Sequence, residues 1–218
     1  MSTPVVESAR GEAALQRAWW LRVPAVLLAP RPVFAALRDD SAEAARARQE
    51  PVSAIAGLAG VAGVLSTSVA RHLLNDGSID TVVIPVWAFI GGACYALVVY
   101  WILGGCLYAA ARGLGSLGSY RRARHLLAYA AVPLALSLLV FWPVRIAVYG
   151  SDLFRTGGDD YGRGDTIFGA VNLGFAAWSV ILLLIGVRSV HGWTWSRAAA
   201  TVALAAVFPA LVVLAGSL

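Results

Sequence analysis

The sequence contains five long stretches that have almost no charge. They cover residues 52–70, 82–111, 126–149, 167–187 and 198–218, and the only charged residue in them is Arg145. A helix of about 20 apolar residues crosses the roughly 30 Å core of a bilayer, and a backbone in hydrocarbon must satisfy its own hydrogen bonds. A small soluble core has no room for an uncharged run as long as residues 82–111. The lack of charge therefore excludes a soluble protein.

These stretches predict an all-α polytopic membrane protein with a bundle of five transmembrane helices. A cytoplasmic amphipathic N-terminal segment, residues 1–48, is expected to precede a five-span membrane domain, residues 49–218. The expected spans are about residues 52–70, 86–109, 126–149, 167–187 and 198–217.

Lysine is also absent, so all 17 basic residues are arginines, which suggests a GC-rich bacterial genome. With the N-terminus inside, 13 arginines lie on the inner side of the five spans and three on the outer side. The positive-inside rule therefore predicts a multi-pass protein of the cell membrane with a cytoplasmic N-terminus and an outer C-terminus. The net charge of +5 is then a topology signal, and no nucleic-acid partner is expected.

The predicted spans contain no Asp, Glu or His, and the sequence has no motif of a known enzyme class. Gly113, Gly115 and Gly118 match G-x-G-x-x-G in letters, but the βαβ context that gives this motif its meaning is missing. The two cysteines, Cys94 and Cys106, lie about 18 Å apart along one helix and cannot form a disulfide with each other. We expect no enzymatic activity, no cofactor and no metal.

The N-terminal segment is expected to be partly helical. Residues 1–11 are predicted to be disordered, and residues 12–22 to form a short helix that ends before Pro24. A second helix is expected over residues 33–48. Aromatic residues and arginines on a short amphipathic segment suit the headgroup boundary. The alternative is a small soluble cap packed on the transmembrane helices.

An arginine cluster precedes the third predicted span and consists of Arg121, Arg122 and Arg124. Such a cluster can hold lipid phosphates or an acidic partner. The alternative is that these arginines only set the topology.

Polar residues inside the spans are few. Arg145 and Asn172 lie at similar depth near the outer ends of the third and fourth spans and form a candidate polar pair. The alternative is that Arg145 extends to the outer headgroups. Pro133 is a candidate kink in the third span. The outer loop, residues 150–166, is rich in Asp and Gly, which is typical of a solvated loop, and its spacing does not match a calcium-binding EF-hand.

Three short pieces occur in a recognisable order. They are PRPVFAAL at residues 30–37, GSYRRA at 118–123 followed by AVP at 131–133, and GVRSVHG at 186–192 followed by WSRA at 195–198. This order resembles the bacterial branch of the Yip (Ypt/Rab-interacting protein) domain family over roughly residues 25–217. The resemblance implies a five-helix membrane domain with a cytoplasmic N-terminus. Eukaryotic members are linked to Rab GTPases, a system that bacteria lack.

The family-like residues fall mainly at the predicted cytoplasmic ends of spans, where Arg188 and His191 join the arginine cluster. The main hypothesis is a non-enzymatic scaffold or adaptor that binds a protein or an anionic lipid there. The alternative is a small-solute or lipid transporter or channel, as an oligomer, that uses Arg145 and Asn172. A structural subunit without a ligand is the third possibility. Membrane lipids, another membrane or cytoplasmic protein, and a second copy of the chain are the candidate partners.

Overall fold

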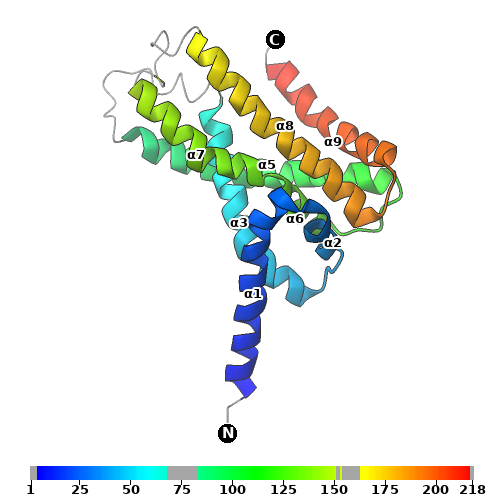
Figure 1. Ribbon diagram of the computed structural model, residues 1–218. Helices are drawn as coiled ribbons and strands as arrows, with labels where there is room; N and C mark the ends of the chain where they lie inside the picture. Colours follow the sequence, from blue (N-terminus) through cyan, green and yellow to red (C-terminus); the bar gives the residue numbers. More distant parts are fainter. Residues whose placement is uncertain (1–3, 68–82, 151–152, 154–162, 217–218) are drawn as a thin grey trace. The chain divides into compact units, whose positions relative to one another are not determined.

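The computed structural model describes residues 4–67, 83–150, 153 and 163–216, and the regular elements among them are all helices (Figure 1). The N-terminal helices are α1 (Pro4–Leu28), α2 (Pro30–Ala36) and α3 (Ala42–Leu65). They are followed by α5 (Val83–Gly113), α6 (Tyr120–Ala130), α7 (Val132–Tyr149), α8 (Arg163–His191) and α9 (Trp195–Gly216). The predicted all-α fold is confirmed.

The helices divide between two compact units. Unit 1 contains Met1–Ala54, Trp101–Ala130 and Leu182–Leu218, and unit 2 contains Ile55–Tyr100 and Ala131–Ile181. The helices α3, α5 and α8 each contribute residues to both units.

Among the residues that the structure describes, three helical segments are long and apolar enough to cross a membrane: Phe89–Gly113, Tyr120–Tyr149 and Gly164–His191. A shorter apolar segment, Trp195–Leu211, lies in α9. The first predicted span, residues 52–70, coincides with α3 as far as Leu65, and its last residues lie outside the described part of the chain. Three of the five predicted spans thus correspond to helices of membrane-crossing length.

The N-terminal helices differ from the prediction. The first helix, α1, begins at Pro4, within the stretch predicted to be disordered, and it continues through Pro24 to Leu28 instead of ending there. Pro24 removes one backbone hydrogen bond of α1, because it has no N–H to donate to the carbonyl of Trp20, and its ring crowds that carbonyl. Burial of Trp19 and Val26 in unit 1 favours the continuous helix.

The predicted second helix over residues 33–48 is also wrong, because the chain leaves helical structure between α2 and α3. The backbone N–H of Ala44 donates to Ser41 Oγ over 3.2 Å, and the N–H of Ser41 donates to Asp39 Oδ1 over 3.0 Å. Ser41 therefore caps the N-terminus of α3, as Ser and Asp do at many helix starts. The acidic pair Asp39 and Asp40 directly before Ser41 is the sequence signal for this break.

Pro133 lies close to a helix boundary. The helix α6 ends at Ala130 and α7 begins at Val132, so Pro133 falls in the first turn of α7. The first turn is the position where a missing N–H costs least, because the first four N–H groups of a helix have no partner within it.

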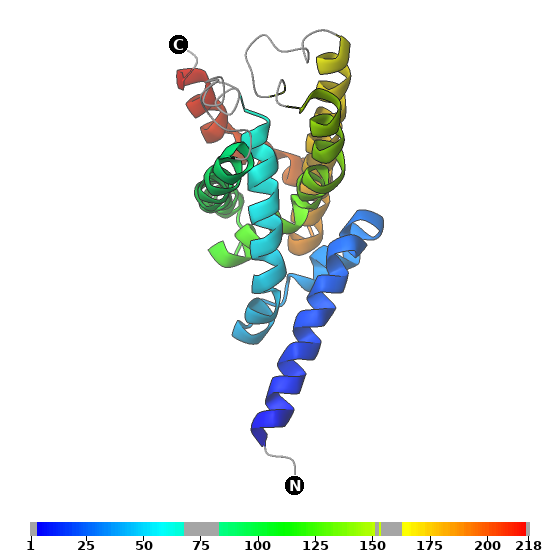
Figure 2. The ribbon, with the colours of Figure 1, turned by 90° about the vertical axis from the view of Figure 1, so that its left-hand side faces the viewer.

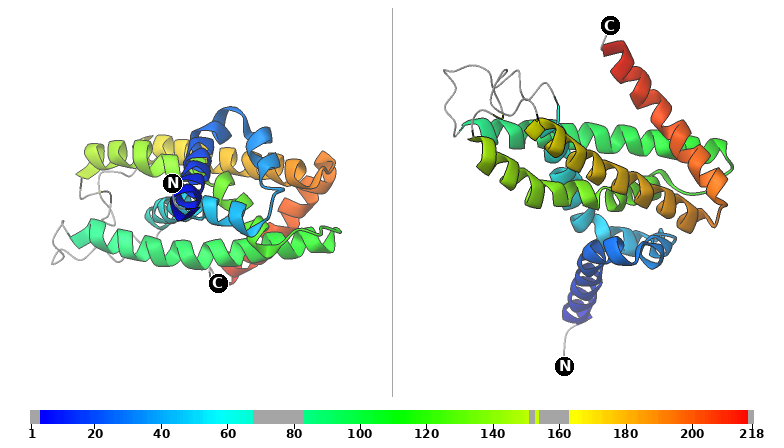
Figure 3. Two further views of the ribbon diagram at one scale, coloured as in Figure 1. Left: turned by 90° about the horizontal axis from the view of Figure 1, so that it is seen from below. Right: turned by 45° about the horizontal axis from the view of Figure 1, so that its top comes forward.

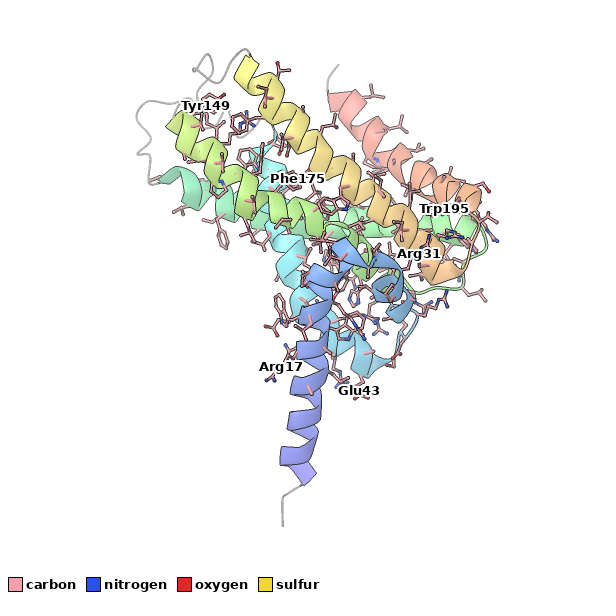
Figure 4. The ribbon with its side chains drawn as sticks, viewed as in Figure 1. Arg17, Arg31, Glu43, Tyr149, Phe175 and Trp195 are labelled. Carbon is pink, nitrogen blue, oxygen red and sulfur yellow. The ribbon has the colours of Figure 1, made fainter. Side chains whose placement is uncertain are left out.

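Unit 2 is held together by an aromatic cluster. Phe141 of α7 packs against Phe168 and Phe175 of α8, with ring centroids 5.6 and 6.2 Å away. Tyr149 stacks edge-on against Phe168 at 5.5 Å, and Figure 4 shows Tyr149 and Phe175 on these two helices. Figure 3 shows α7 running alongside α8. The aromatic contacts explain this pairing.

A second contact in unit 2 depends on small residues where α3 crosses α5 (Figure 2). A Cβ atom added at Gly92 of α5 would lie 2.6 Å from the Cα atom of Val61 on α3. A Cβ atom added at Gly60 would collide with Ala96. Small residues of this kind let helix backbones approach closely in membranes.

We expect Gly92→Ala to lower the melting temperature of the detergent-solubilised protein. The added methyl group meets the α3 backbone, and overpacking of this kind costs about 1–3 kcal/mol. The matched control is Gly91→Ala, the adjacent position on α5, where an added Cβ atom has nothing within 4 Å. Equal melting temperatures for the two variants would contradict the close crossing.

Candidate functional site

In unit 1, hydrogen bonds link the connection between α2 and α3 to the start of α6 and to the end of α8. Arg38 Nε donates a hydrogen bond to the carbonyl oxygen of Ser189 on α8 over 3.0 Å. Arg122 Nη2 of α6 donates to the carbonyl oxygen of Arg38 over 2.8 Å. The connection lies between Arg31 and Glu43, both labelled in Figure 4. Segments that are far apart in the sequence are therefore fixed to each other by arginine side chains.

The centre of this arrangement is the carboxylate of Asp40. Its Oδ1 atom accepts hydrogen bonds from Arg48 Nη2 and Arg121 Nε, both over 3.1 Å. Its Oδ2 atom accepts a hydrogen bond from the hydroxyl of Ser119 and lies 3.9 Å from Arg122 Nη2. Three guanidinium groups thus converge on one carboxylate. We call the residues Asp40, Arg48, Ser119, Arg121 and Arg122 the Asp40 cluster.

Arg48 is the buried member of the Asp40 cluster, with none of its surface exposed. Its Nε atom donates to His125 Nδ1 over 2.6 Å, and its Nη1 atom donates to the carbonyl oxygen of Asp39 over 2.7 Å. A guanidinium group can only donate, so His125 Nδ1 must be the acceptor and carries no proton. The Arg48 guanidinium also lies 5.5 Å from the centre of the Trp19 ring.

The environment shifts the pKa values of the two central groups. Partial burial raises the pKa of the Asp40 carboxyl, but hydrogen bonds from Ser119 and Arg121 outweigh this effect, so the pKa lies below its ordinary value of 3.8. Burial lowers the pKa of the Arg48 guanidinium, and the charge of Asp40 opposes that shift. The charged form of each group is therefore stabilised by the charge of the other, because burying an ion without its partner costs free energy.

The predicted site residues occupy different surroundings within unit 1. Arg121 and Arg122 belong to the Asp40 cluster, whereas Arg124 lies apart from it. The Arg124 guanidinium sits over the ring of Trp101 at 3.6 Å and over that of Tyr120 at 4.9 Å. Cation–π contacts of this kind hold an arginine against an aromatic face. Of the three arginines, two therefore belong to the Asp40 cluster, and the third, Arg124, packs against aromatic rings.

The other two predicted residues also lie against aromatic rings. The Arg188 guanidinium is 4.6 Å from the centre of Trp195, which Figure 4 labels on α9. The ring of His191 stacks on that of Trp193, with centroids 4.4 Å apart, and His191 Nδ1 lies 3.4 Å from Ser116 Oγ. A small pocket beside these residues has room for about one water molecule.

The candidate intramembrane pair lies in unit 2, where each member has a partner that the sequence analysis did not name. Arg145 Nη2 forms an ion pair with Asp165 Oδ1 over 3.1 Å. Asn172 Nδ2 donates a hydrogen bond to Ser66 Oγ over 3.3 Å. Direct pairing of Arg145 with Asn172 stays a prediction.

Sequence reasoning missed four members of the site: Asp40, Arg48, Ser119 and His125. Arg48 was counted only as one of the N-terminal arginines that set the topology. His125 directly follows the arginine cluster, and Asp40 lies in a connection that was expected to be helical. The acidic pair before a capping serine was the available signal for Asp40. No sequence signal connects it to residues 79 and 81 positions later in the chain.

The long apolar helices define the class of protein: an integral membrane protein of the multi-pass type. Comparison with protein families then identifies the chain more closely, because the Yip1 domain matches residues 25–217. The chain belongs to the Yip1 domain family. Comparisons with curated proteins and with solved structures find no match.

We expect Arg48→Met to destabilise the protein strongly. Removing one member of a buried ion pair typically costs about 3–5 kcal/mol, because the partner charge stays buried without compensation. Thermal unfolding in detergent measures the effect. The matched control is Arg46→Met, an exposed arginine of the same helix, which should change stability by no more than about 0.5 kcal/mol. Similar losses of stability in both variants would contradict the conclusion that the buried ion pair of Arg48 stabilises the fold.

The stability should also depend on pH through Asp40. Its pKa is lower in the folded than in the unfolded protein, so its contribution is complete above 3.8 and is lost as the pH falls through the folded value. Across roughly pH 5 to pH 3, the wild type should lose more of its melting temperature than Asp40→Asn, which cannot titrate there. Parallel melting curves for the two proteins would show that Asp40 does not contribute in this way.

Proposed function

We propose that this protein is a non-enzymatic membrane scaffold or adaptor that binds a protein or an anionic lipid at its cytoplasmic face. The proposal includes five spans, a cytoplasmic N-terminus, an outer C-terminus and a place in the cell membrane. The distribution of arginines supports this topology, and the absence of lysine supports a bacterial member of the family. In this topology the N-terminus of α6 and the C-terminus of α8 face the cytoplasm.

The observation that carries the proposal is the surplus of positive charge in the Asp40 cluster. Three arginines share one carboxylate, and the side chain of Arg121 is 40% exposed while that of Arg122 is 22% exposed. Their guanidinium groups are held in place by Asp40 and by backbone carbonyls, so they need little ordering when a partner binds. A fixed basic surface of this kind attracts an acidic partner.

The non-enzymatic role is proposed because the sequence has no motif of a known enzyme class, and a serine–histidine contact among the described residues of unit 1 is compatible with it. Ser116 Oγ lies 3.4 Å from His191 Nδ1, longer than the roughly 2.6–3.2 Å of a nucleophile and its base. The Ser116 hydroxyl oxygen also accepts a hydrogen bond from the N–H of Gly118 over 3.0 Å.

The transporter alternative rests on the polar residues of unit 2. Arg145 is paired with Asp165 and Asn172 donates to Ser66, so protein groups account for the polarity of both. A transported solute is not needed to explain why these residues are there. We therefore favour the scaffold or adaptor.

The test is capture of partners from native membranes by crosslinking. We compare the wild type with Arg121→Gln/Arg122→Gln, and we expect the variant to lose the partner while it still inserts into the membrane. The matched control is Arg17→Gln/Arg46→Gln, which removes the same charge at two exposed positions of unit 1. This control should capture the partner as the wild type does.

A partner that is captured equally by all three proteins would exclude the Asp40 cluster as its binding surface. Loss from both double variants would show that overall positive charge, rather than this cluster, attracts the partner. The melting temperature of each variant is measured in detergent beforehand, so that only folded proteins are compared.

A further inference from the structure

The Asp40 cluster has the charge balance of an anion-binding site. Its three guanidinium groups carry three positive charges, Asp40 supplies one negative charge in direct contact, and the exposed Asp39 adds a second that acts on Arg48 and Arg122, so one positive charge is in excess. Arg48 is fully buried, and the charge of Arg121 opposes its ionisation in addition to the cost of burial. An anion with more charge than a carboxylate would therefore bind here more favourably than Asp40 does.

The start of α6 adds a second feature that suits an oxyanion. Ser119 Oγ accepts a hydrogen bond from the N–H of Arg122 over 3.0 Å and so caps this helix, which spans 11 residues. The same hydroxyl donates to Asp40 Oδ2. Helix N-termini favour negative charge, and hydroxyl and guanidinium donors are common ligands of phosphate. The Asp40 carboxylate thus occupies a place suited to a phosphate oxygen.

The cluster also has donor capacity that Asp40 leaves unused. Arg122 Nη2 lies 3.9 Å from Asp40 Oδ2, which is within ion-pair distance but too far for a hydrogen bond. The buried Nε atom of Arg122 has no hydrogen-bond acceptor among the residues that the structure describes. A phosphate group is larger than a carboxylate and has an additional oxygen that can accept from such donors.

We infer that the Asp40 cluster binds a phosphate group, and that Asp40 is an internal counter-ion that the phosphate displaces. The group is either the headgroup phosphate of an anionic lipid or a soluble phosphate. The inference rests on the proposed function and names the chemistry that its basic surface recognises. Displacement of Asp40 also releases the connection between α2 and α3 from the start of α6, which couples binding to the N-terminal helices.

The first experiment measures binding to the detergent-solubilised full-length protein by native mass spectrometry. Phosphatidic acid and inorganic phosphate are the two probes, and phosphatidylcholine is the control lipid. Asp40→Asn should bind phosphatidic acid about tenfold more tightly than wild type, because a competing charge is removed; this equals about 1.4 kcal/mol. The matched control is Glu43→Gln, which also replaces a carboxylate by an amide, at an exposed residue of the nearby first turn of α3, and should bind as the wild type does.

The arginine variants test the same site by removing its donors, whereas Asp40→Asn removes the competing carboxylate. Arg121→Gln/Arg122→Gln should bind phosphatidic acid at least about tenfold more weakly than the wild type, since two donors are lost. The exposed Arg46→Gln should bind it unchanged. Binding of inorganic phosphate with the same pattern across variants shows that the cluster recognises the phosphate itself. Binding of phosphatidic acid alone shows that the lipid is the source.

A measurement on the wild type keeps the inference testable if Asp40→Asn does not fold. Phosphatidic acid should increase amide hydrogen exchange in residues 38–41 and decrease it at the start of α6, because Asp40 leaves and the phosphate takes its place. Unchanged exchange in both segments would overturn the inference. So would the absence of binding of both probes, or equal affinities for phosphatidic acid in Asp40→Asn and Glu43→Gln.

The two proposals fail separately. If Arg121→Gln/Arg122→Gln loses its captured partner but Asp40→Asn gains no affinity for phosphatidic acid, the phosphate inference is wrong and the adaptor stands. If capture is unaffected while phosphate binding follows the expected pattern, the cluster is a phosphate site and the adaptor surface lies elsewhere.

Discussion

The guanidinium group of Arg48 imposes the strictest requirement on unit 1. It is fully buried, and burial of an unpaired ion costs several kcal/mol. Three acceptors meet this requirement: the Asp40 carboxylate, the Asp39 carbonyl and the His125 ring. The first two lie in the connection between α2 and α3, and the third lies on α6. The buried charge can be satisfied only when these segments come together, so it fixes their arrangement.

Asp40 extends this arrangement to the start of α6. Ser119 and Arg121 bind its carboxylate, and Arg122 binds the backbone of the same connection at Arg38. Arg38 in turn donates to the end of α8. A short polar connection thereby joins helices whose own contacts are mainly apolar. Packing of apolar side chains tolerates small displacements, whereas a set of charged hydrogen bonds specifies one position.

Hydropathy predicted the helices well because a bilayer restricts the chain to few structures. A long uncharged stretch in hydrocarbon must be helical, so residues 86–109 and 167–187 could be placed from the sequence alone. The N-terminal segment has no such restriction. There the expected break at Pro24 did not occur, because tertiary burial outweighed a local preference. The break between α2 and α3 was missed because the capping role of Ser41 was not recognised.

The candidate site was predicted in part, and the comparison with unit 2 shows why the unpredicted part matters. Arg121 and Arg122 were identified, but Asp40 and Arg48 were not, because their contacts join residues 77 to 81 positions apart. Arg145 in unit 2 is also buried, yet it has the carboxylate of Asp165 within 3.1 Å and lies over the rings of Trp142 and Phe168. One arginine opposite one carboxylate is a balanced pair that a structural role explains. Asp40 is instead shared by three arginines, with Asp39 acting on Arg48 and Arg122 from farther away, so this cluster keeps a positive charge that a single ion pair does not have.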